Sequence, residues 1–256
     1  MKLLLKLRYD GSCFFGYQVQ PSQRTVQGEL NIASEKLLGT KCNITGCSRT
    51  DSGVHADAFY ASVETVGCAT PSIPTDGIVR AYNSFLPSDI CVCEAKYVAD
   101  TFHPRYDVLN KEYTYKFYES EIHDPFLRNY MLRIDKAYSD EQVKLVCDAC
   151  THLLGEHDFA AFMSSGSNVK STVRKIEYAY LKRTSPNTLE FKICADGFLY
   201  NMVRIIVGTM MDVAQKKIDP IDIKKIIESK DRRYASKTAP SMGLYLSCVR
   251  YPDKLL

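Results

Sequence analysis

The sequence has no long apolar run, little net charge and only one Cys-x-x-Cys pair, and each of these absences excludes some classes of function. No apolar stretch approaches the roughly 18 residues that a membrane-spanning helix needs. The first eight residues, Met1 to Arg8, are too few and too interrupted by lysine for a signal peptide. We therefore expect a cytoplasmic protein with no membrane partner.

The charge balance neither requires nor excludes a nucleic-acid partner. The net charge is +3 and the isoelectric point about 8.2, below the value of roughly 9 that by itself marks a nucleic-acid-binding domain. A basic cluster at Lys230, Arg232, Arg233 and Lys237 could follow phosphates or form a solvated helix end, and both interpretations stay open.

Ten cysteines are present, but their spacing indicates neither disulfides nor metal. Only Cys147 and Cys150 form a Cys-x-x-Cys pair, and no second pair lies at the spacing of a zinc site. Both belong to a helical apolar stripe with Val143, Val146 and Leu153. Buried free thiols in a reducing compartment are therefore expected, and no metal.

The first half of the chain predicts a β-α-β-β-α-β order. Leu3, Leu5, Leu7 and Tyr9 lie on one face and Lys2, Lys6 and Arg8 on the other, as in a half-buried strand. From Thr25 to Gly39 the apolar period becomes helical. The remaining elements are expected at 42–45 (strand), 60–65 (strand), 76–85 (helix) and 90–97 (strand). This order is that of the ferredoxin-like split unit.

The second half repeats this order with additions. Strands are expected at 111–118, 130–134, 173–183, 188–194 and 243–250, and helices at 139–154, 200–214 and from Asp219 onward. We place the boundary between an N-terminal subdomain, 1–104, and a C-terminal subdomain, 105–256. The predicted fold class is α+β, with two ferredoxin-like units forming one extended, mostly antiparallel sheet. Helices would cover one face and leave the other as a platform for RNA.

The stretch from Gly46 to Ala56 is the most informative in the chain. It places Asp51, Arg49 and His55 within seven residues of turn-forming sequence. Catalytic groups concentrate on such loops, although clusters of Ser, Thr, Asp and Gly more often only build turns. The motif must therefore be weighed with the rest of the chain.

This stretch resembles the Arg-Thr-Asp-Ala-Gly-Val-His-Ala signature of the tRNA pseudouridine synthase A (TruA) family. Ser52 stands where the family has Ala, Tyr17 where Trp is usual, and Asp57-Ala58-Phe59 replaces a stretch that usually contains Gly-Gln. Further similar motifs follow in family order along the whole chain: Tyr9-Asp10-Gly11, Phe15-Gly16, Thr25-Val26-Gln27, Leu86-Pro87-x-Asp89, Phe102-His103-x-Arg105, Tyr113-x-Tyr115, Leu154-Gly155-x-His157-Asp158-Phe159, Met202-Val203-Arg204 with Gly208, and Gly243-Leu244-Tyr245.

The resemblance implies an isomerase that needs no cofactor. It implies that Asp51 is the nucleophile, that Arg204 is its cationic partner, that Tyr113 stacks on or hydrogen-bonds the extruded uracil, and that Arg49 contacts phosphate or fills the gap left by the base. It further implies a homodimer that modifies uridines at positions 38 to 40 of the tRNA anticodon stem-loop, by analogy with bacterial relatives.

From the residues alone, other interpretations stay open. Tyr113 and Tyr115 could be inward-facing strand aromatics, Arg204 could extend from its helix to solvent, and Arg49 could be a solvated loop residue. His55 and His103 are expected to be structural or to contact RNA. The alternative functions are a nucleoside-hydrolysing N-glycosidase and a non-catalytic RNA-binding module, although the strand signature of RRM modules is absent.

Overall fold

A computed structural model describes residues 1–67, 70, 73–166 and 169–255. The chain forms two compact units. The first contains residues 1–109 and the C-terminal residues from Tyr245 onward, and the second contains residues 110–244. This division differs from our boundary at residue 104, because the final strand β10 (Leu244–Arg250) pairs with a strand of the first unit, with Tyr245 opposite His55.

The first unit has the expected β-α-β-β-α-β order. Strand β1 pairs antiparallel with both β3 and β4, and β2 pairs antiparallel with β3. Strand β10 pairs in parallel with the start of β3. The elements are β1 (Lys2–Tyr9), α1 (Val26–Leu38), β2 (Cys42–Gly46), β3 (His55–Thr65), α2 (Thr75–Phe85) and β4 (Ile90–Val98), with a short 3₁₀ turn η1 (Gly11–Cys13) after β1.

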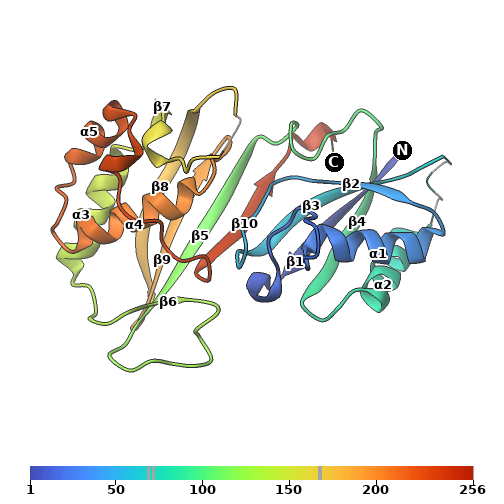
Figure 1. Ribbon diagram of the computed structural model, residues 1–256, viewed down its shortest axis with the longest axis horizontal. Helices are drawn as coiled ribbons and strands as arrows, with labels where there is room; N and C mark the ends of the chain where they lie inside the picture. Colours follow the sequence, from blue (N-terminus) through green and yellow to red (C-terminus); the bar gives the residue numbers. More distant parts are fainter. Residues whose placement is uncertain (68–69, 71–72, 167–168, 256) are drawn as a thin grey trace. The chain divides into compact units, whose positions relative to one another are not determined.

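The predicted periodicities explain how these elements pack. Leu3, Leu5 and Leu7 of β1 are almost completely buried. Helix α1 begins where the Thr25 hydroxyl accepts a hydrogen bond from the Gly28 amide. Figure 1 shows α1 and α2 side by side on one face of the strands of this unit. The sheet and its two helices thus form a single layered core.

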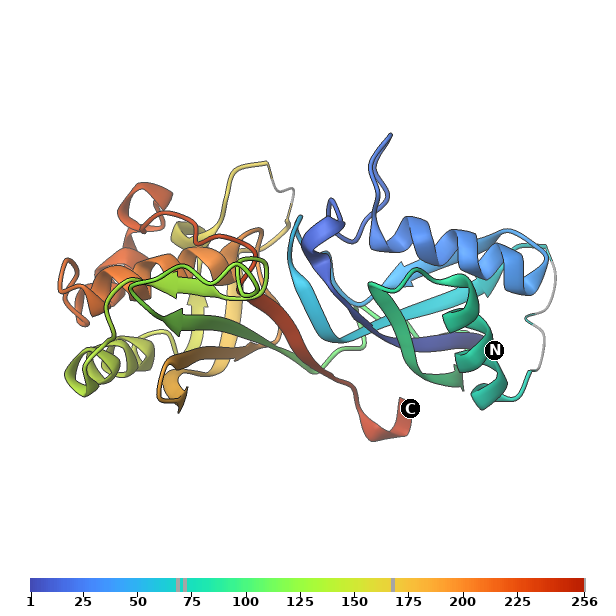
Figure 2. The ribbon, with the colours of Figure 1, turned by 90° about the horizontal axis from the view of Figure 1, so that it is seen from below.

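The second unit contains the other predicted elements apart from the final strand, and it has one additional strand, β7. Helix α5 begins at Asp222, three residues after the expected start at Asp219. Its strand order is β5-β9-β8-β7 with antiparallel neighbours, and β6 pairs in parallel with β5. Strand β7 was not predicted, because it is only four residues long. Helices α3 and α4 pack together and α3 also contacts β8 (Figure 2). The elements are β5 (Asn110–Glu119), β6 (Leu132–Ile134), α3 (Asp140–Thr151), β7 (Gly155–Asp158), β8 (Val173–Ser185), β9 (Thr188–Ala195), α4 (Met202–Ala214) and α5 (Asp222–Ser229).

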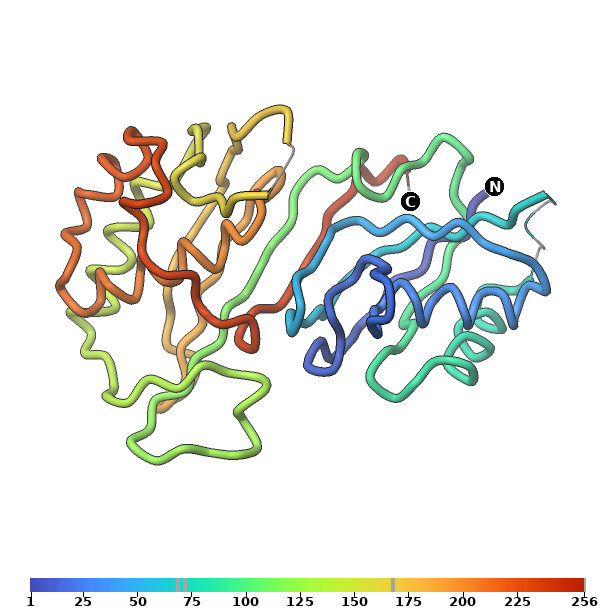
Figure 3. Tube along the Cα trace, in the orientation of Figure 1, coloured from blue at the N-terminus to red at the C-terminus, as the bar shows by residue number. Residues whose placement is uncertain are grey.

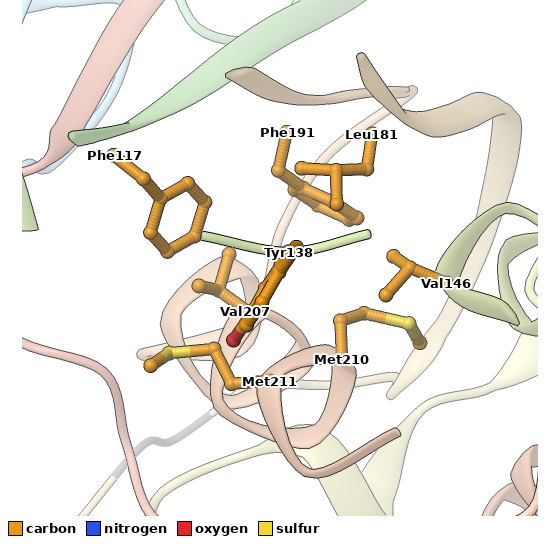
Figure 4. A pocket seen from close by; sticks show the side chains of 8 residues that line it. All are labelled: Phe117, Tyr138, Val146, Leu181, Phe191, Val207, Met210 and Met211. Carbon is orange, nitrogen blue, oxygen red and sulfur yellow. The ribbon is translucent and has the colours of Figure 1, made fainter. Parts of the chain in front are cut away.

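Apolar side chains from these helices and strands form the core of the second unit. Figure 4 shows a small apolar cavity there, lined by Phe117, Tyr138, Val146, Leu181, Phe191, Val207, Met210 and Met211. Cys150 of α3 is buried, and Cys147 donates to the Leu181 carbonyl at 3.2 Å. All cysteines in the described ranges are free thiols, and Cys147, expected to be buried, is only half-buried.

The predicted fold class is confirmed. The described part of the chain is α+β, with ten strands in mostly antiparallel pairing.

Candidate active site

Asp51 lies in the loop between β2 and β3 of the first unit. Strand β3 begins at His55, earlier than the expected start at residue 60, so the end of the motif is already part of the sheet. The side chain of Thr50 is buried, that of Asp51 is half-buried and that of Arg49 is exposed. The loop therefore anchors itself through Thr50 and leaves Asp51 and Arg49 accessible.

Two glycines allow the loop to fold so tightly. Gly53 has a φ of +76°, and the amide next to it, Val54 N–H, donates to the Asp51 carbonyl at 3.2 Å. Gly16, with a φ of +89°, lies directly beneath the loop: a Cβ there would be 2.7 Å from the Thr50 carbonyl oxygen. Only glycine accepts both this backbone conformation and this approach.

The segment before α1 carries the loop through hydrogen bonds, and Figure 3 shows the two segments side by side. Tyr17 N–H donates to the Thr50 carbonyl at 3.1 Å, and Gly53 N–H donates to the Phe14 carbonyl at 3.3 Å. The hydroxyls of Tyr9 and Thr50 are 2.8 Å apart in a buried hydrogen bond. The backbone on both sides of Asp51 is thus fixed from below.

Arg24 in turn holds Phe14. Its guanidinium lies 4.2 Å from the centre of the Phe14 ring and donates to both carboxylate oxygens of Asp89, at 2.7 and 2.9 Å. Glu29 accepts a third hydrogen bond at 2.8 Å. The hydrogen bonds to Asp89, and to a smaller extent the one to Glu29, raise the pKa of Arg24 above its ordinary value. The motif residue Asp89 therefore supports the Asp51 loop indirectly, through Arg24 and Phe14.

Two of the departures from the family pattern contact each other. The rings of Tyr17 and Phe59 stack with their centres 4.4 Å apart. Both side chains are buried, at 3% and 0% exposure. The Tyr17 hydroxyl has no hydrogen-bond partner among the described residues, and burial raises its pKa. The two substitutions thus form one packing arrangement beneath the loop and leave Asp51 itself unchanged.

Removal of this unpartnered hydroxyl should stabilise the protein. We expect Tyr17→Phe to raise the free energy of unfolding by about 1 kcal/mol, because a buried polar group without a partner carries a desolvation cost. The matched control is Tyr82→Phe. The Tyr82 hydroxyl is hydrogen-bonded to Ser34 at 2.8 Å, so its removal should lower the free energy of unfolding by about 1 kcal/mol. Denaturant unfolding of both variants measures the difference, and equal destabilisation would contradict the prediction.

Tyr113 lies in β5 of the second unit, opposite Ile193 of β9. It is 6% exposed, and its ring meets the edge of Phe198 at a centroid distance of 5.2 Å and an angle of 90°. Tyr115, two residues on, is fully buried and donates to the Pro240 carbonyl at 2.8 Å. Tyr113 thus occupies the buried strand position that the alternation predicted, and most of its ring is covered.

Arg204 lies in the first turn of α4, also in the second unit. It is half-buried, and its Nε donates to the Ala239 carbonyl at 2.8 Å. One terminal nitrogen donates to the Asn201 side-chain oxygen at 2.9 Å. Helix α4 packs closely on the segment of residues 237–239, since a Cβ at Gly208 would be 1.9 Å from the Lys237 carbonyl oxygen. The guanidinium is therefore oriented by these contacts and does not extend freely into solvent.

Comparison with known proteins identifies the family. Residues 7–107 and 149–252 match the family model described as tRNA pseudouridine synthase. The chain belongs to this family. It is 41% identical to tRNA pseudouridine synthase A of Caldicellulosiruptor bescii, over 97% of this chain and 99% of the relative. It is 40% identical to tRNA pseudouridine synthase A 2 of Clostridium perfringens, over 96% and 98%.

Among solved structures, a Cbf5-Nop10-Gar1 complex is similar over 96% of this chain and 49% of that chain, with 11% identity. The TM-score of 0.38 is too low to support an argument about the site. The chain is therefore assigned as an isomerase of the pseudouridine synthase family from the family model and the relatives alone.

The four predicted site residues are divided between the two units. Arg49 and Asp51 share one loop of the first unit, and Tyr113 and Arg204 belong to the second unit. Sequence reasoning did not identify the support beneath Asp51, which Tyr9, Phe14 and Gly16 provide. The motifs at residues 9–18 indicated that this segment is important, but they did not indicate that it contacts the Asp51 loop.

Among the described residues, no group of three or more His, Cys, Asp or Glu side chains is arranged to hold a metal ion. No helix in the described ranges is long and apolar enough to cross a membrane.

Proposed function

We propose that this synthase isomerises uridine to pseudouridine at positions 38 to 40 of the tRNA anticodon stem-loop, with Asp51 as the nucleophile. The observation that carries the proposal is the loop itself. A half-buried carboxylate stands on a backbone fixed by Thr50, Gly53 and Gly16, in a family of tRNA pseudouridine synthases. Such preorganisation is what stabilisation of developing charge requires.

The proposed reaction breaks the bond between N1 of uracil and C1′ of the ribose, turns the base, and joins C5 of the base to C1′. The proton on C5 is lost, and N1 gains one. Substrate and product contain the same atoms, so no oxidant or reductant takes part. Cleavage gives C1′ oxocarbenium character, which an ionised carboxylate can stabilise or trap, as in glycoside hydrolysis. The accessible side chain of Asp51 suits this role.

We propose that Tyr113, Arg204 and Arg49 act at the same site in the complex with tRNA. A tyrosine ring offers a face for stacking on uracil and a hydroxyl that can position a water or relay a proton. A guanidinium beside Asp51 would keep the carboxylate ionised when the substrate excludes water. Arg49 is exposed and suits a phosphate contact or the gap left by the base. These three roles rest on the family resemblance.

The target nucleotide must leave the stem before reaction. A paired uridine hides C1′ and N1 from a protein side chain, so extrusion of the base is required at a cost of a few kcal/mol. A mismatch opposite the target uridine lowers that cost. The proposal therefore favours a faster reaction at a mismatched target than at a paired one.

A single assay separates the proposal from its alternatives. The purified protein is incubated with an unmodified tRNA transcript. One part of the product is analysed for free uracil and, after digestion to nucleosides, for pseudouridine, and the other part is kept intact and mapped by sequencing after carbodiimide treatment. Pseudouridine at positions 38 to 40 supports the proposal. Free uracil would instead indicate an N-glycosidase, and binding without any product would indicate an RNA-binding module. Pseudouridine at other positions would leave the activity in place and overturn the proposed site specificity.

Loss of the Arg204 charge should shift the pH dependence of the reaction. We expect Arg204→Leu to lower activity and to move the acidic limb of the pH–rate profile to higher pH, because removal of a nearby cation raises the pKa of a carboxylate. The limb is measured under single-turnover conditions between about pH 5 and 8. Arg204→Lys, which keeps the charge, is the control and should shift the limb less. A folded and slow Arg204→Leu variant with an unshifted profile would separate Arg204 from Asp51.

We also propose that the synthase is a homodimer in the cytoplasm. A single chain carries a net charge of +3, a weak field for so large a polyanion, and two copies would double it. The free thiols of the described cysteines are compatible with a reducing compartment. Light scattering at micromolar concentration should give twice the chain mass of 29.0 kDa. An active particle of 29.0 kDa would contradict the dimer.

A further inference from the structure

His55 is a buried imidazole that the proposed reaction does not use. It is the first residue of β3, four positions after Asp51, and only 2% exposed. Sequence analysis left open whether it is structural or contacts RNA, and its burial favours the structural role.

The hydrogen bond to Gly11 determines the protonation of the ring. The Gly11 amide nitrogen lies 3.0 Å from Nδ1 of His55. A backbone amide can only donate, so we assign Nδ1 as the acceptor, without a proton. The ring is then neutral, with its hydrogen on Nε2. Asp10 Oδ1 also lies 3.3 Å from Nδ1, but this contact is not an ion pair while Nδ1 accepts from Gly11. That carboxylate accepts instead from Ser12 N–H at 2.9 Å.

The other contacts of His55 fix the ring plane. Tyr245 of β10 stacks on the imidazole with the ring centres 4.6 Å apart and the planes 19° apart. The same two residues are opposite each other in the parallel pairing of β3 and β10. The ring thus has a fixed plane and a fixed acceptor atom, and the acceptor points at the turn after β1.

This turn is the base on which the Asp51 loop rests. A Cβ at Gly11 would be 2.0 Å from the Val54 carbonyl oxygen, so the turn and the end of the loop are in direct contact. The turn continues into Phe14, whose carbonyl accepts from Gly53 N–H at 3.3 Å. His55 holds the start of the segment, and the loop that contains Asp51 is bonded to its end.

We propose that neutral His55 is a positioning residue for Asp51. Its Nδ1 fixes the Gly11 amide, and through residues 11–14 it sets the place of the carboxylate relative to the substrate. The inference rests on the proposed role of Asp51. His55 contacts no substrate in this account, so its loss should affect the rate of the chemical step and leave tRNA binding unchanged.

The test uses two amides that differ in the position of one acceptor. In His55→Asn the side-chain Oδ1 takes the place of Nδ1, whereas in His55→Gln the Oε1 takes the place of Nε2. We expect His55→Gln to lower the single-turnover rate by about 10²-fold, as a misplacement near 1 Å does, with tRNA affinity within about threefold. His55→Asn should stay within about tenfold of the parent, at a temperature where both variants are folded. Equal rates for the two amides would overturn the proposal.

A second measurement reads the tautomer in the parent protein and needs a variant only to assign the signal. Two-dimensional ¹⁵N spectra of the parent protein with labelled histidine report which ring nitrogen carries the proton, and His55→Asn identifies the signal. We expect Nε2–H with an unprotonated Nδ1, and Nδ1–H would overturn the proposal. Asp51→Asn is assayed alongside: if it were active, the proposed function of Asp51 would fail while the tautomer of His55 stood as measured.

Discussion

Asp51→Asn should lower the rate of pseudouridine formation by at least about 10³-fold, because an amide can neither trap nor stabilise positive charge at C1′ as an ionised carboxylate does. The substitution keeps the size of the side chain and leaves the bonds of Thr50 and Gly53 to the neighbouring segment in place. Affinity for tRNA should change only a few-fold, since phosphate contacts dominate binding. Single-turnover rates and filter binding measure the two quantities.

The matched control is Asp57→Asn. Asp57 lies six residues further along the chain, in β3, and pairs with Arg8 at 3.1 Å on the protein surface. Loss of an exposed ion pair costs at most about 1 kcal/mol of stability and should not affect the rate. Turnover of Asp51→Asn within tenfold of the parent would remove Asp51 from the catalytic role.

Gly16→Ala should be the most harmful substitution outside the motif itself. The added methyl group would lie 2.7 Å from the Thr50 carbonyl oxygen and 3.3 Å from the carbonyl carbon of Asp51, both backbone atoms of the loop. The φ of +89° adds strain of about 1–3 kcal/mol for a residue with a Cβ. The loop must move to make room, and a displacement near 1 Å can lower the rate about 10²-fold.

Gly39→Ala separates the backbone strain from the loop movement. Gly39 ends α1 with a φ of +69°, and a Cβ there would meet nothing within 4 Å. It should lower the free energy of unfolding by about 1 kcal/mol and leave the rate unchanged. Thermal unfolding and single-turnover assays of both variants test the pair. Equal rates for Gly16→Ala and the parent would show that the loop tolerates the displacement.

Most of the regular elements were predictable because their buried residues follow one period, although Leu4, which interrupts the alternation in β1, is also buried. The alternation of Leu3, Leu5 and Leu7 and the apolar stripe beginning at Val26 each specify a periodicity, and the structure confirms the strand and the helix. The short strand β7, with only four residues, contains too few residues for alternation to be visible. The start of β3 at His55 was missed because turn-forming residues precede it and the pairing partners lie far away in the chain.

Chain topology explains why the structure divides the chain differently from the boundary that we placed at residue 104. The final strand follows the second half in sequence, but its Tyr245 pairs with His55 of the first unit. Local patterns contain no information on such a long-range pairing. For the same reason the candidate site was predictable as a set of motifs, whereas the hydrogen bonds that support Asp51 through Phe14 and Tyr17 were not.

The central claim is that the carboxylate of Asp51 makes pseudouridine in the anticodon stem-loop of tRNA. It is tested most directly by mapping pseudouridine in bulk tRNA from cells that lack this protein, complemented with the parent or with Asp51→Asn. The account predicts that pseudouridine at positions 38 to 40 is absent without the protein, returns with the parent and stays absent with Asp51→Asn. An unchanged pattern in the cells without the protein, or restoration by Asp51→Asn, would contradict it.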